Sequence, residues 1–300
     1  MRCFLCGIMV GALALVACAS GAEGQATAAQ LIVYIGTYTK GTGSEGIYVY
    51  HFNSITGELT KQSSVSAVNP SFLAVARNKK YLYSVGEISG NDDRPAGGVS
   101  AFAIAGAMGS LTLLNAQSSG GKGPCHLVTD VHDKMVLVAN YGSGDVAALP
   151  ILGDGSLGPV TGYMKHAGSG PNEERQKEPH AHSFNVSPDN KYAYAADLGI
   201  DKILIYRLDT ENSDIQPNPY QWAKVAPGAG PRHLTFHPNG KFVYVINELN
   251  ATITGFGLCI QQTLYFFPLP HGQGAFLPIL LLIFVQSVDK FSEMPLYFPA

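Results

Sequence analysis

The chain repeats itself about every 54 residues, and this internal repeat limits the possible folds more than any other feature of the sequence. An alternating pattern of aromatic and aliphatic residues recurs at spacings of 54, 57 and 50 residues, starting at Tyr81, Met135, Tyr192 and Phe242. About ten residues before each of these strands lies another short segment, starting at Pro70, Pro124, His182 and Pro231. A period of this length indicates a repeat architecture in which each unit packs against its neighbours.

Each repeat has room for four short strands. The first and second strands are separated by turn residues at 78–80, 187–191 and 237–241, which are rich in the Asn, Asp, Pro and Gly that favour turns. The pattern predicts third strands at 98–104, 145–151 and 202–208, and fourth strands at 109–113 and 155–159. Residues 31–60 resemble the later strands of a preceding unit.

Four short antiparallel strands in each unit predict an all-β fold, and specifically a β-propeller with about five blades present in this chain. A stacked solenoid is the alternative, although its units are usually shorter or helical. The charged fraction of 14% and the 34 glycines suit an all-β protein with many tight turns. The net charge is −3 and the sequence has no cluster of basic residues, so we expect no nucleic-acid partner.

The first 30 residues differ in composition from the rest. Arg2 precedes a mostly apolar run over 3–17, and small residues follow. This order predicts a secretory signal peptide, since the run is too short to span a membrane. Residues 15–18 resemble the lipobox of bacterial lipoproteins, in which Cys18 would be acylated; a plain signal peptide with an incidental cysteine is the alternative. We therefore expect an exported protein, periplasmic or anchored at the cell envelope, with membrane attachment only through Cys18.

The repeat pattern ends near Phe256. We predict an incomplete propeller over 31–256 and a tail over 257–300 that does not belong to it, because residues 251–300 carry only three charged residues and include an apolar run at 277–285. Our hypothesis is that an altered reading frame or unspliced sequence replaces the true C-terminus. Blades at the two ends of such a chain would expose faces that a closed ring buries.

Equivalent positions of the repeat form rings around the axis of a propeller, because the innermost strand of each blade lines the central channel. One such position is held by Ser71, Cys125, His182 and Arg232, and another by Glu87, Tyr141, Leu198 and Glu248. A histidine, an arginine and a carboxylate at one channel mouth suit acid–base chemistry and anion binding, so we predict His182, Arg232 and Glu248 as catalytic residues. The alternatives are a packed histidine and a structural Arg232–Glu248 ion pair.

Four segments carry a resemblance to a known family. The sequences PHAHSF at 179–184, DLG at 197–199, GPRH at 230–233 and VINEL at 245–249 resemble the signature segments of the seven-bladed propeller lactonases. This family includes a bacterial 6-phosphogluconolactonase type and the fungal carboxymuconate-lactonizing enzymes. The resemblance runs from about Leu31 to Phe256. It implies seven blades and a central-channel site with a histidine (His182 or its neighbour His180), Arg232 and Glu248, and a further arginine that would lie beyond Phe256.

The resemblance implies a metal-independent sugar-lactone hydrolase, acting on a small-molecule lactone without a cofactor. Lactone opening needs a base for water, which suits His182, and positive charge near the developing oxyanion, which suits Arg232. Glu248 would orient the histidine or shuttle the proton. A muconate-type cycloisomerase and a non-catalytic exported binding propeller are the alternatives. We expect a monomer.

Three further histidines are candidates for substrate binding. His180 lies beside the predicted base, and His126 and His233 each follow a channel position by one residue. Packing between blades is the alternative for His126 and His233. No cysteine–histidine spacing matches a zinc site, so we expect no metal.

Overall fold

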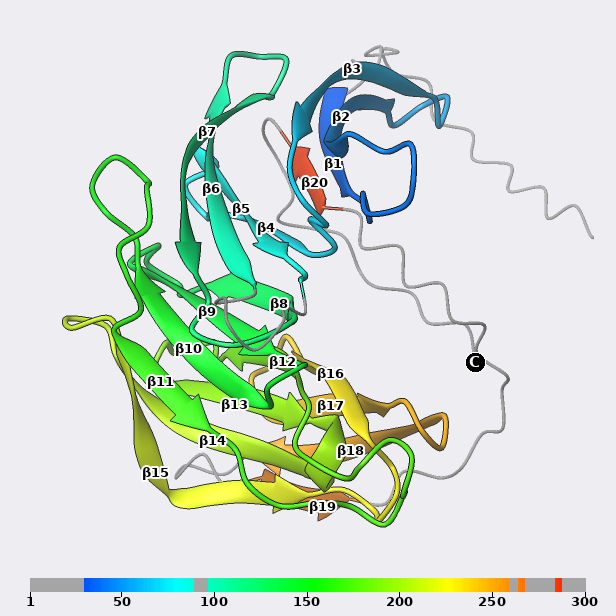
Figure 1. The fold of residues 1–300 in the computed structure, drawn as a ribbon, viewed down its shortest axis with the longest axis vertical. Coiled ribbons are helices and arrows are strands. Elements are labelled where there is room, and N and C mark those ends of the chain that lie inside the picture. Colours follow the sequence, from blue (N-terminus) through cyan, green and yellow to red (C-terminus); the bar gives the residue numbers. More distant parts are fainter. Residues whose placement is uncertain (1–29, 89–96, 259–263, 268–283, 288–300) are drawn as a thin grey trace, which may run out of the picture.

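The computed structural model describes residues 30–88, 97–258, 264–267 and 284–287. Within these residues, all the regular structure is antiparallel β-sheet apart from one 3₁₀ turn, η1, at Leu198–Ile200. The strands form five four-stranded sheets, which we call blades and number along the chain (Figure 1). The prediction of an all-β propeller with about five blades is therefore confirmed. No helix in the described part of the chain is both long enough and apolar enough to cross a membrane.

The first blade has the order β20-β1-β2-β3, in which strands from both ends of the described chain pair. Its strands are β1 Gln30–Gly36, β2 Gly46–Asn53, β3 Leu59–Ser66 and β20 Phe284–Ser287. The second blade comprises β4 Leu73–Val75, β5 Tyr81–Gly86, β6 Gly98–Ala105 and β7 Ser110–Ser118. The third comprises β8 Pro124–Thr129, β9 Met135–Asn140, β10 Asp145–Pro150 and β11 Gly162–Lys165.

The fourth and fifth blades repeat the same order of strands. The fourth comprises β12 Ala181–Val186, β13 Tyr192–Asp197, β14 Lys202–Asp209 and β15 Asp214–Lys224. The fifth comprises β16 Pro231–Phe236, β17 Phe242–Asn247, β18 Thr252–Leu258 and β19 Leu264–Phe267. The first and second strands of each repeat therefore lie where the sequence predicts them.

The blades stand around an arc, with one edge strand of each blade on its inner side (Figure 1). These inner strands are β20, β4, β8, β12 and β16, and each contacts the next along the arc. We call the inner side of the arc lined by β4, β8, β12 and β16 the hub. Residues far apart in the sequence meet there, because each blade brings one inner strand to it.

The hydrophobic core consists of four clusters, each lying between two neighbouring blades. Strand β9 shows how one strand serves two of them. Met135 and Leu137 pack toward the fourth blade, whereas Val136 and Val138 pack toward the second. Alternate side chains of a strand point to opposite faces, so a strand that lies between two blades is apolar throughout. This explains why the second strands are apolar at nearly every position.

Buried tyrosines join neighbouring blades by hydrogen bonds. The Tyr34 hydroxyl donates to the Gly109 carbonyl at 2.9 Å, and the Tyr83 hydroxyl donates to the Gly155 carbonyl at 3.0 Å. Burial raises the pKa of Tyr34 to about 12, so its hydroxyl stays protonated as a donor. Both glycines have positive φ, +67° and +84°, and a Cβ on either would collide with the neighbouring blade. The glycine turns are therefore part of the contact between blades.

One predicted fourth strand is wrong. Residues 155–159 form only an isolated bridge between Ile151 and Leu157, and the fourth strand of this blade is β11, a few residues later. Leu157 is buried in the core cluster between the second and third blades, and its carbonyl accepts from the side chains of Asn115 and Gln117. The segment therefore bonds both to the second blade and to the end of β10, where the Gly158 amide donates to the Pro150 carbonyl at 2.9 Å, without forming a regular strand.

Of the predicted tail 257–300, the structure describes residues 257–258 and the strands β19 and β20. Strand β19 pairs with β18 as the outer strand of the fifth blade, and β20 pairs with β1 in the first blade. The rest of that tail lies outside the described residues, as do the predicted signal peptide up to residue 29 and the proposed acylation site Cys18.

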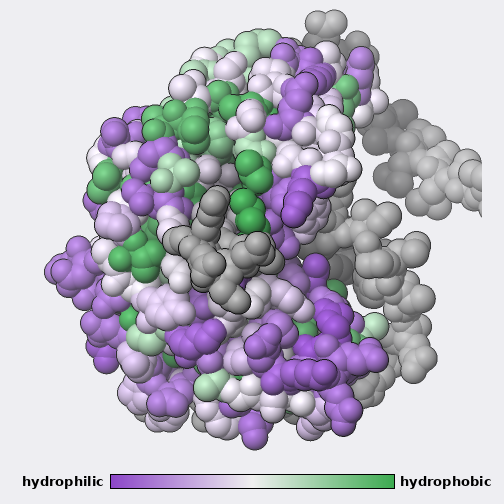
Figure 2. All heavy atoms as spheres, viewed as in Figure 1, coloured by the Kyte–Doolittle hydropathy of each residue, from purple (hydrophilic) through white to green (hydrophobic). Residues whose placement is uncertain are grey.

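Apolar side chains on the surface are unevenly distributed on the face viewed. Figure 2 shows them gathered in the upper half, over the second blade and its border with the third, whereas the lower half is mostly hydrophilic. Met108 and Leu113, at the outer end of the second blade, are both about half exposed. Exposed apolar side chains of this kind are ordinary in folded proteins.

Candidate active site at the hub

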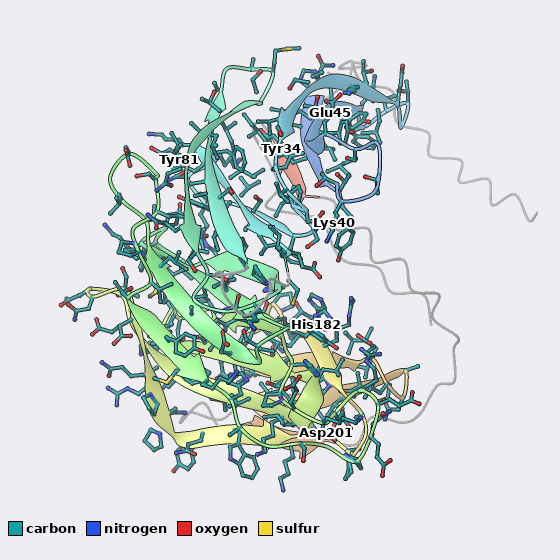
Figure 3. All side chains as sticks on the ribbon, in the orientation of Figure 1. Tyr34, Lys40, Glu45, Tyr81, His182 and Asp201 are labelled. Atoms are coloured by element: carbon teal, nitrogen blue, oxygen red, sulfur yellow. The ribbon has the colours of Figure 1, made fainter. Side chains whose placement is uncertain are left out.

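The innermost strands of three blades each contain a β-bulge at the same repeat position. In β8, β12 and β16 the pairing with the second strand skips one residue, and the skipped residues are Cys125, His182 and Arg232. A bulge leaves one residue out of the ladder and redirects its side chain. Three of the four residues predicted at this channel position therefore leave the sheets at equivalent places, and His182 lies on the inner side of the arc (Figure 3).

A repeated backbone hydrogen bond brings the second predicted ring beside the first. The amide of the residue just past the second strand donates to a carbonyl eighteen residues earlier, at 2.8–3.0 Å. The four pairs are Glu87 to Asn69, Tyr141 to Gly123, Leu198 to His180 and Glu248 to Gly230. Each carbonyl lies two residues before a residue of the first ring, so each member of the second ring is held close to its partner sixteen residues earlier.

The structure brings His182, Arg232 and Glu248 together. Arg232 donates its Nε–H to Nε2 of His182 at 3.1 Å, and the same Nε lies 3.0 Å from Oε2 of Glu248. His182 Nε2 and Glu248 Oε2 are 3.8 Å apart. Because Nε2 of His182 accepts a hydrogen bond, the neutral ring carries its proton on Nδ1, which lies 3.8 Å from the Cys125 sulfur.

The environment keeps the His182 ring neutral. Burial, followed by the positive charge of Arg232, lowers the pKa of His182 to about 3. Both effects disfavour an imidazolium in this position. At neutral pH the site therefore offers an unprotonated imidazole nitrogen next to a guanidinium and a carboxylate.

Arg175 is a member of the site that the repeat pattern does not predict. Its Nη2 donates to Oε1 of Glu248 at 2.7 Å and to the Tyr141 hydroxyl at 3.2 Å. Glu248 thus lies between two guanidinium groups, with Arg232 at one carboxylate oxygen and Arg175 at the other. Arg175 comes from the connection between β11 and β12, which has no counterpart in the other repeats, so only its closeness to the 179–184 motif points to it.

Gln176 fixes the loop that carries Arg175. Its buried side chain donates to the Leu198 carbonyl and to Oδ1 of Asp201, both at 2.8 Å. Leu198, the third member of the second ring, is itself fully buried and lies in η1. It therefore supports the loop and presents no side chain for chemistry.

His180 packs against Tyr141. The two rings are stacked at 4.5 Å with an interplanar angle of 14°, and Nδ1 of His180 is 3.0 Å from the Tyr141 carbonyl oxygen. The His180 amide donates to Asp197, whose other carboxylate oxygen is 2.5 Å from Nδ1 of the buried His166. His180 thus positions Tyr141, while His182 is the histidine that contacts Arg232.

His126 and His233 form an aromatic cluster at the hub with Phe72 and His182. The ring centroids of His233 lie 5.3 Å from both His126 and His182, and Phe72 lies 4.3 Å from His126. Burial is the main cause that lowers the pKa of His233 to about 3 and that of His126 well below its usual value. His126 Nδ1 also accepts from the Phe184 amide at 3.3 Å. His126 and His233, two of the three predicted substrate-binding histidines, are thus neutral and packed against each other at the hub.

The other described side of the hub carries a second carboxylate. Oε2 of Glu87 accepts hydrogen bonds from Ser71 Oγ at 2.5 Å and from the Tyr38 hydroxyl at 2.8 Å. Ser71 and Glu87 occupy the ring positions that Arg232 and Glu248 hold in the fifth blade. Over the residues that the structure describes, no group of three or more His, Cys, Asp or Glu side chains is placed to hold a metal ion.

This arrangement combines a neutral imidazole, a polarising guanidinium and a carboxylate around one point. Such a set can move a proton while stabilising negative charge on a substrate.

Comparison with known proteins agrees with the fold. The sequence model of the family described as lactonase, 7-bladed beta-propeller, matches residues 32–265. The chain is 41% identical over 227 residues to a 6-phosphogluconolactonase of Bacillus subtilis and 35% identical over 228 residues to one of Formosa agariphila. These matches cover 74% and 75% of this chain but 61% and 64% of the relatives, so the chain spans less than two thirds of their length.

A solved structure gives the same result. The periplasmic gluconolactonase of Pseudomonas aeruginosa superposes with a TM-score of 0.75 at 31% identity, covering 82% of this chain and 70% of that one. The match of the family model to most of the chain, together with these relatives, settles the assignment. The chain belongs to the family of seven-bladed β-propeller lactonases.

Proposed function

We propose that this protein is a lactone hydrolase that opens a sugar lactone of the gluconolactone type at the hub. The observation that carries the proposal is the contact of Arg232 Nε with both His182 Nε2 and Glu248 Oε2, at 3.1 Å and 3.0 Å. The names of the relatives from Bacillus subtilis, Formosa agariphila and Pseudomonas aeruginosa support the same substrate class.

In the proposed reaction, the oxygen of a water molecule attacks the lactone carbonyl carbon. Its proton passes to Nε2 of His182, which is already neutral at pH 7. The carbonyl oxygen becomes an oxyanion, and Arg232 turns from His182 to bind it. The tetrahedral intermediate then collapses, the ring C–O bond breaks, and the proton on His182 moves to the leaving ring oxygen. The product is a hydroxy acid.

The low pKa of His182 has burial as its first cause and the charge of Arg232 as its second. It is compatible with this role because the transition state removes the second cause. In the free site, the charge of Arg232 contributes to the lowering. Once an oxyanion pairs with Arg232, that charge is neutralised and the pKa of His182 rises. Glu248, at 3.8 Å from Nε2, then stabilises the imidazolium that forms. Arg175 holds Glu248 in place for this step.

We propose that the reaction needs no metal ion, because the guanidinium of Arg232 supplies the positive charge that polarises the carbonyl. Incubation with a chelator should then leave the rate unchanged, and a loss of activity that zinc or magnesium restores would contradict this part of the proposal.

The test is hydrolysis of gluconolactone and 6-phosphogluconolactone by the full chain and its variants. We expect Arg232→Ala and Glu248→Gln each to lower kcat/KM by roughly 10²–10³-fold. The exposed residues Arg207 and Glu211 give matched controls, and Arg207→Ala and Glu211→Gln should keep wild-type rates. Equal rates in all variants, or turnover of a carboxymuconate alone, would contradict the proposal. Lactone binding without turnover would indicate a binding propeller.

We further propose that the protein acts as a monomer outside the cytoplasm. The signal-like composition of residues 1–30 and the periplasmic relative support this location. On fractionation of cells expressing the chain, we expect envelope-bound protein that Cys18→Ser releases in soluble form. Recovery of uncleaved protein from the cytosol would contradict export.

A further inference from the structure

The second blade places the carboxylate of Glu87 at the hub by the same kind of backbone hydrogen bond that places Glu248. The Glu87 amide donates to the Asn69 carbonyl at 3.0 Å, as the Glu248 amide does to the Gly230 carbonyl at 2.8 Å. Glu87 therefore reaches the same level of the hub as Glu248, from a blade three positions along the arc. The proposed reaction gives Glu87 no role.

The surroundings of the two carboxylates differ in charge. Glu248 lies between Arg175 and Arg232, whereas the partners of Glu87 are the hydroxyl groups of Ser71 and Tyr38. None of the ion pairs among the described residues includes Glu87. The hub thus has a cationic side in the fourth and fifth blades and an anionic, hydroxyl-lined side in the second.

Cys125 lies between these two sides. Burial raises the pKa of its thiol, the negative charge of Glu87 raises it further, and the positive charge of Arg232 acts against both. The Cys125 sulfur is also 3.8 Å from Nδ1 of His182. The ring of Phe72, next to Ser71, lies 4.3 Å from the ring of His126 and 6.1 Å from that of His233, the residues that follow Cys125 and Arg232. A ligand bound over Cys125 and His182 would therefore meet both sides of the hub.

We infer that Glu87, with Tyr38 and Ser71, forms a hydroxyl-binding subsite that selects polyhydroxylated lactones over plain alkyl lactones. This inference rests on the proposed function and adds to it the residues that recognise the hydroxyl groups of the substrate. A carboxylate only accepts hydrogen bonds, and each sugar hydroxyl has one to donate. The hydroxyls of Tyr38 and Ser71 can turn from Glu87 to accept or donate as the ligand requires. With the lactone carbonyl near Arg232, its ring hydroxyls would then point to the second blade.

The experiment compares two substrates in two variants of the full chain. Gluconolactone carries ring hydroxyls, and δ-valerolactone has the same lactone ring without them. For Glu87→Gln we expect KM for gluconolactone to rise about tenfold, the scale of one hydrogen bond to a charged group. The kcat for gluconolactone and both constants for δ-valerolactone should stay within about twofold of wild type.

Glu45→Gln is the matched control. Glu45 also accepts a hydrogen bond from a serine, Ser64, but it lies on the first blade, well away from His182 (Figure 3). Its variant should behave as wild type with both substrates. Tyr38→Phe provides a second variant with little risk to the fold, because Tyr38 is more than half exposed, and it should raise KM for gluconolactone alone.

The outcomes separate this inference from the proposed function. If the wild type hydrolyses neither lactone, the proposed function fails. If it hydrolyses both, and Glu87→Gln changes the two substrates equally or changes neither, then the subsite is refuted while the hydrolase stands. Loss of both activities with a lowered melting temperature in Glu87→Gln would refute the subsite too, provided that Tyr38→Phe leaves KM for gluconolactone unchanged.

Discussion

Arg232 donates its Nε–H to Nε2 of His182 across the boundary between the fourth and fifth blades, at 3.1 Å. One hydrogen bond thereby fixes the tautomer of the histidine and places a positive charge against it. Its consequences can be measured on the histidine itself, without any substrate.

Removing the Arg232 charge should raise the pKa of His182. In the wild type that pKa is lowered to about 3, first by burial and then by Arg232, so the ring should stay neutral through pH 5. In Arg232→Met the charge is gone, and the titration should move up toward the ordinary histidine value. Histidine-labelled protein followed by NMR would record the shift, with His182→Gln used to assign the signal. An unchanged midpoint would show that Arg232 has no effect on the ring.

The buried histidines should make the protein lose stability in mild acid. His126, His182 and His233 all have folded-state pKa values below the unfolded value near 6.5. Below pH 6.5 the unfolded chain binds protons that the folded protein does not, so the free energy of unfolding falls as pH drops from 6.5 toward 3. Each such group contributes a slope of up to about 1.4 kcal/mol per pH unit.

Urea unfolding between pH 7 and pH 4.5 tests this expectation. Phe72 stands at the repeat position of His126 and His233, so His233→Phe is a substitution that the fold already accommodates once. That variant should lose less stability on acidification than the wild type. Parallel pH profiles for the two proteins would contradict a role for His233.

The tyrosine bonds between blades should each contribute to stability. Tyr83→Phe leaves the Gly155 carbonyl without its hydroxyl donor, and Tyr34→Phe does the same to Gly109. We expect each variant to lose about 1–2 kcal/mol in the free energy of unfolding. The Tyr34 bond joins the first and second blades, and the Tyr83 bond joins the second and third. Urea unfolding of both single variants and of the double variant therefore also tests whether the two losses add. Unfolding energies equal to wild type would show that these bonds contribute nothing net.

Arg175 should matter for activity more than its exposed position suggests. Arg175→Ala removes one of the two guanidinium groups that hold Glu248, and we expect kcat/KM to fall by roughly 10-fold to 100-fold. Lys177, an exposed cation in the same loop, is the control, and Lys177→Ala should have the wild-type rate. If both variants lose activity equally, the effect belongs to the charge of the loop and not to the contact with Glu248.

The sequence predicts the blades well because the information is local. Alternating apolar residues and the turn residues between them determine the second strands, such as Tyr81–Gly86 and Tyr192–Asp197. The same repeat predicts which residues share a ring, because equivalent positions of identical units must meet at the hub. The predicted strand at 155–159 is wrong because Leu157 is buried against the second blade. The spacing of residues within the segment does not indicate such a tertiary contact.

The sequence predicts only those site residues that occupy equivalent positions of the repeat. His182, Arg232 and Glu248 share ring positions and do lie together, although their catalytic roles remain predictions. Arg175 lies in a connection without a counterpart in other units, so no register predicts it. Leu198 holds a ring position, but the 3₁₀ turn buries its side chain. Glu87 belongs to the predicted ring, but the sequence does not predict that its carboxylate accepts hydrogen bonds from Ser71 and Tyr38. Tyr38 belongs to the preceding blade, so its contact with Glu87 depends on how the two blades pack.

The bulges in β8, β12 and β16 have a consequence for how such a protein can change. The residues at these positions are skipped by strand pairing, so replacing one leaves the backbone ladder around it as it was. Cysteine, histidine and arginine already occupy this place in the third, fourth and fifth blades. We therefore expect substitutions at these bulges to alter reactivity while the strand pairing around them is kept, and directed evolution toward other substrates should begin there.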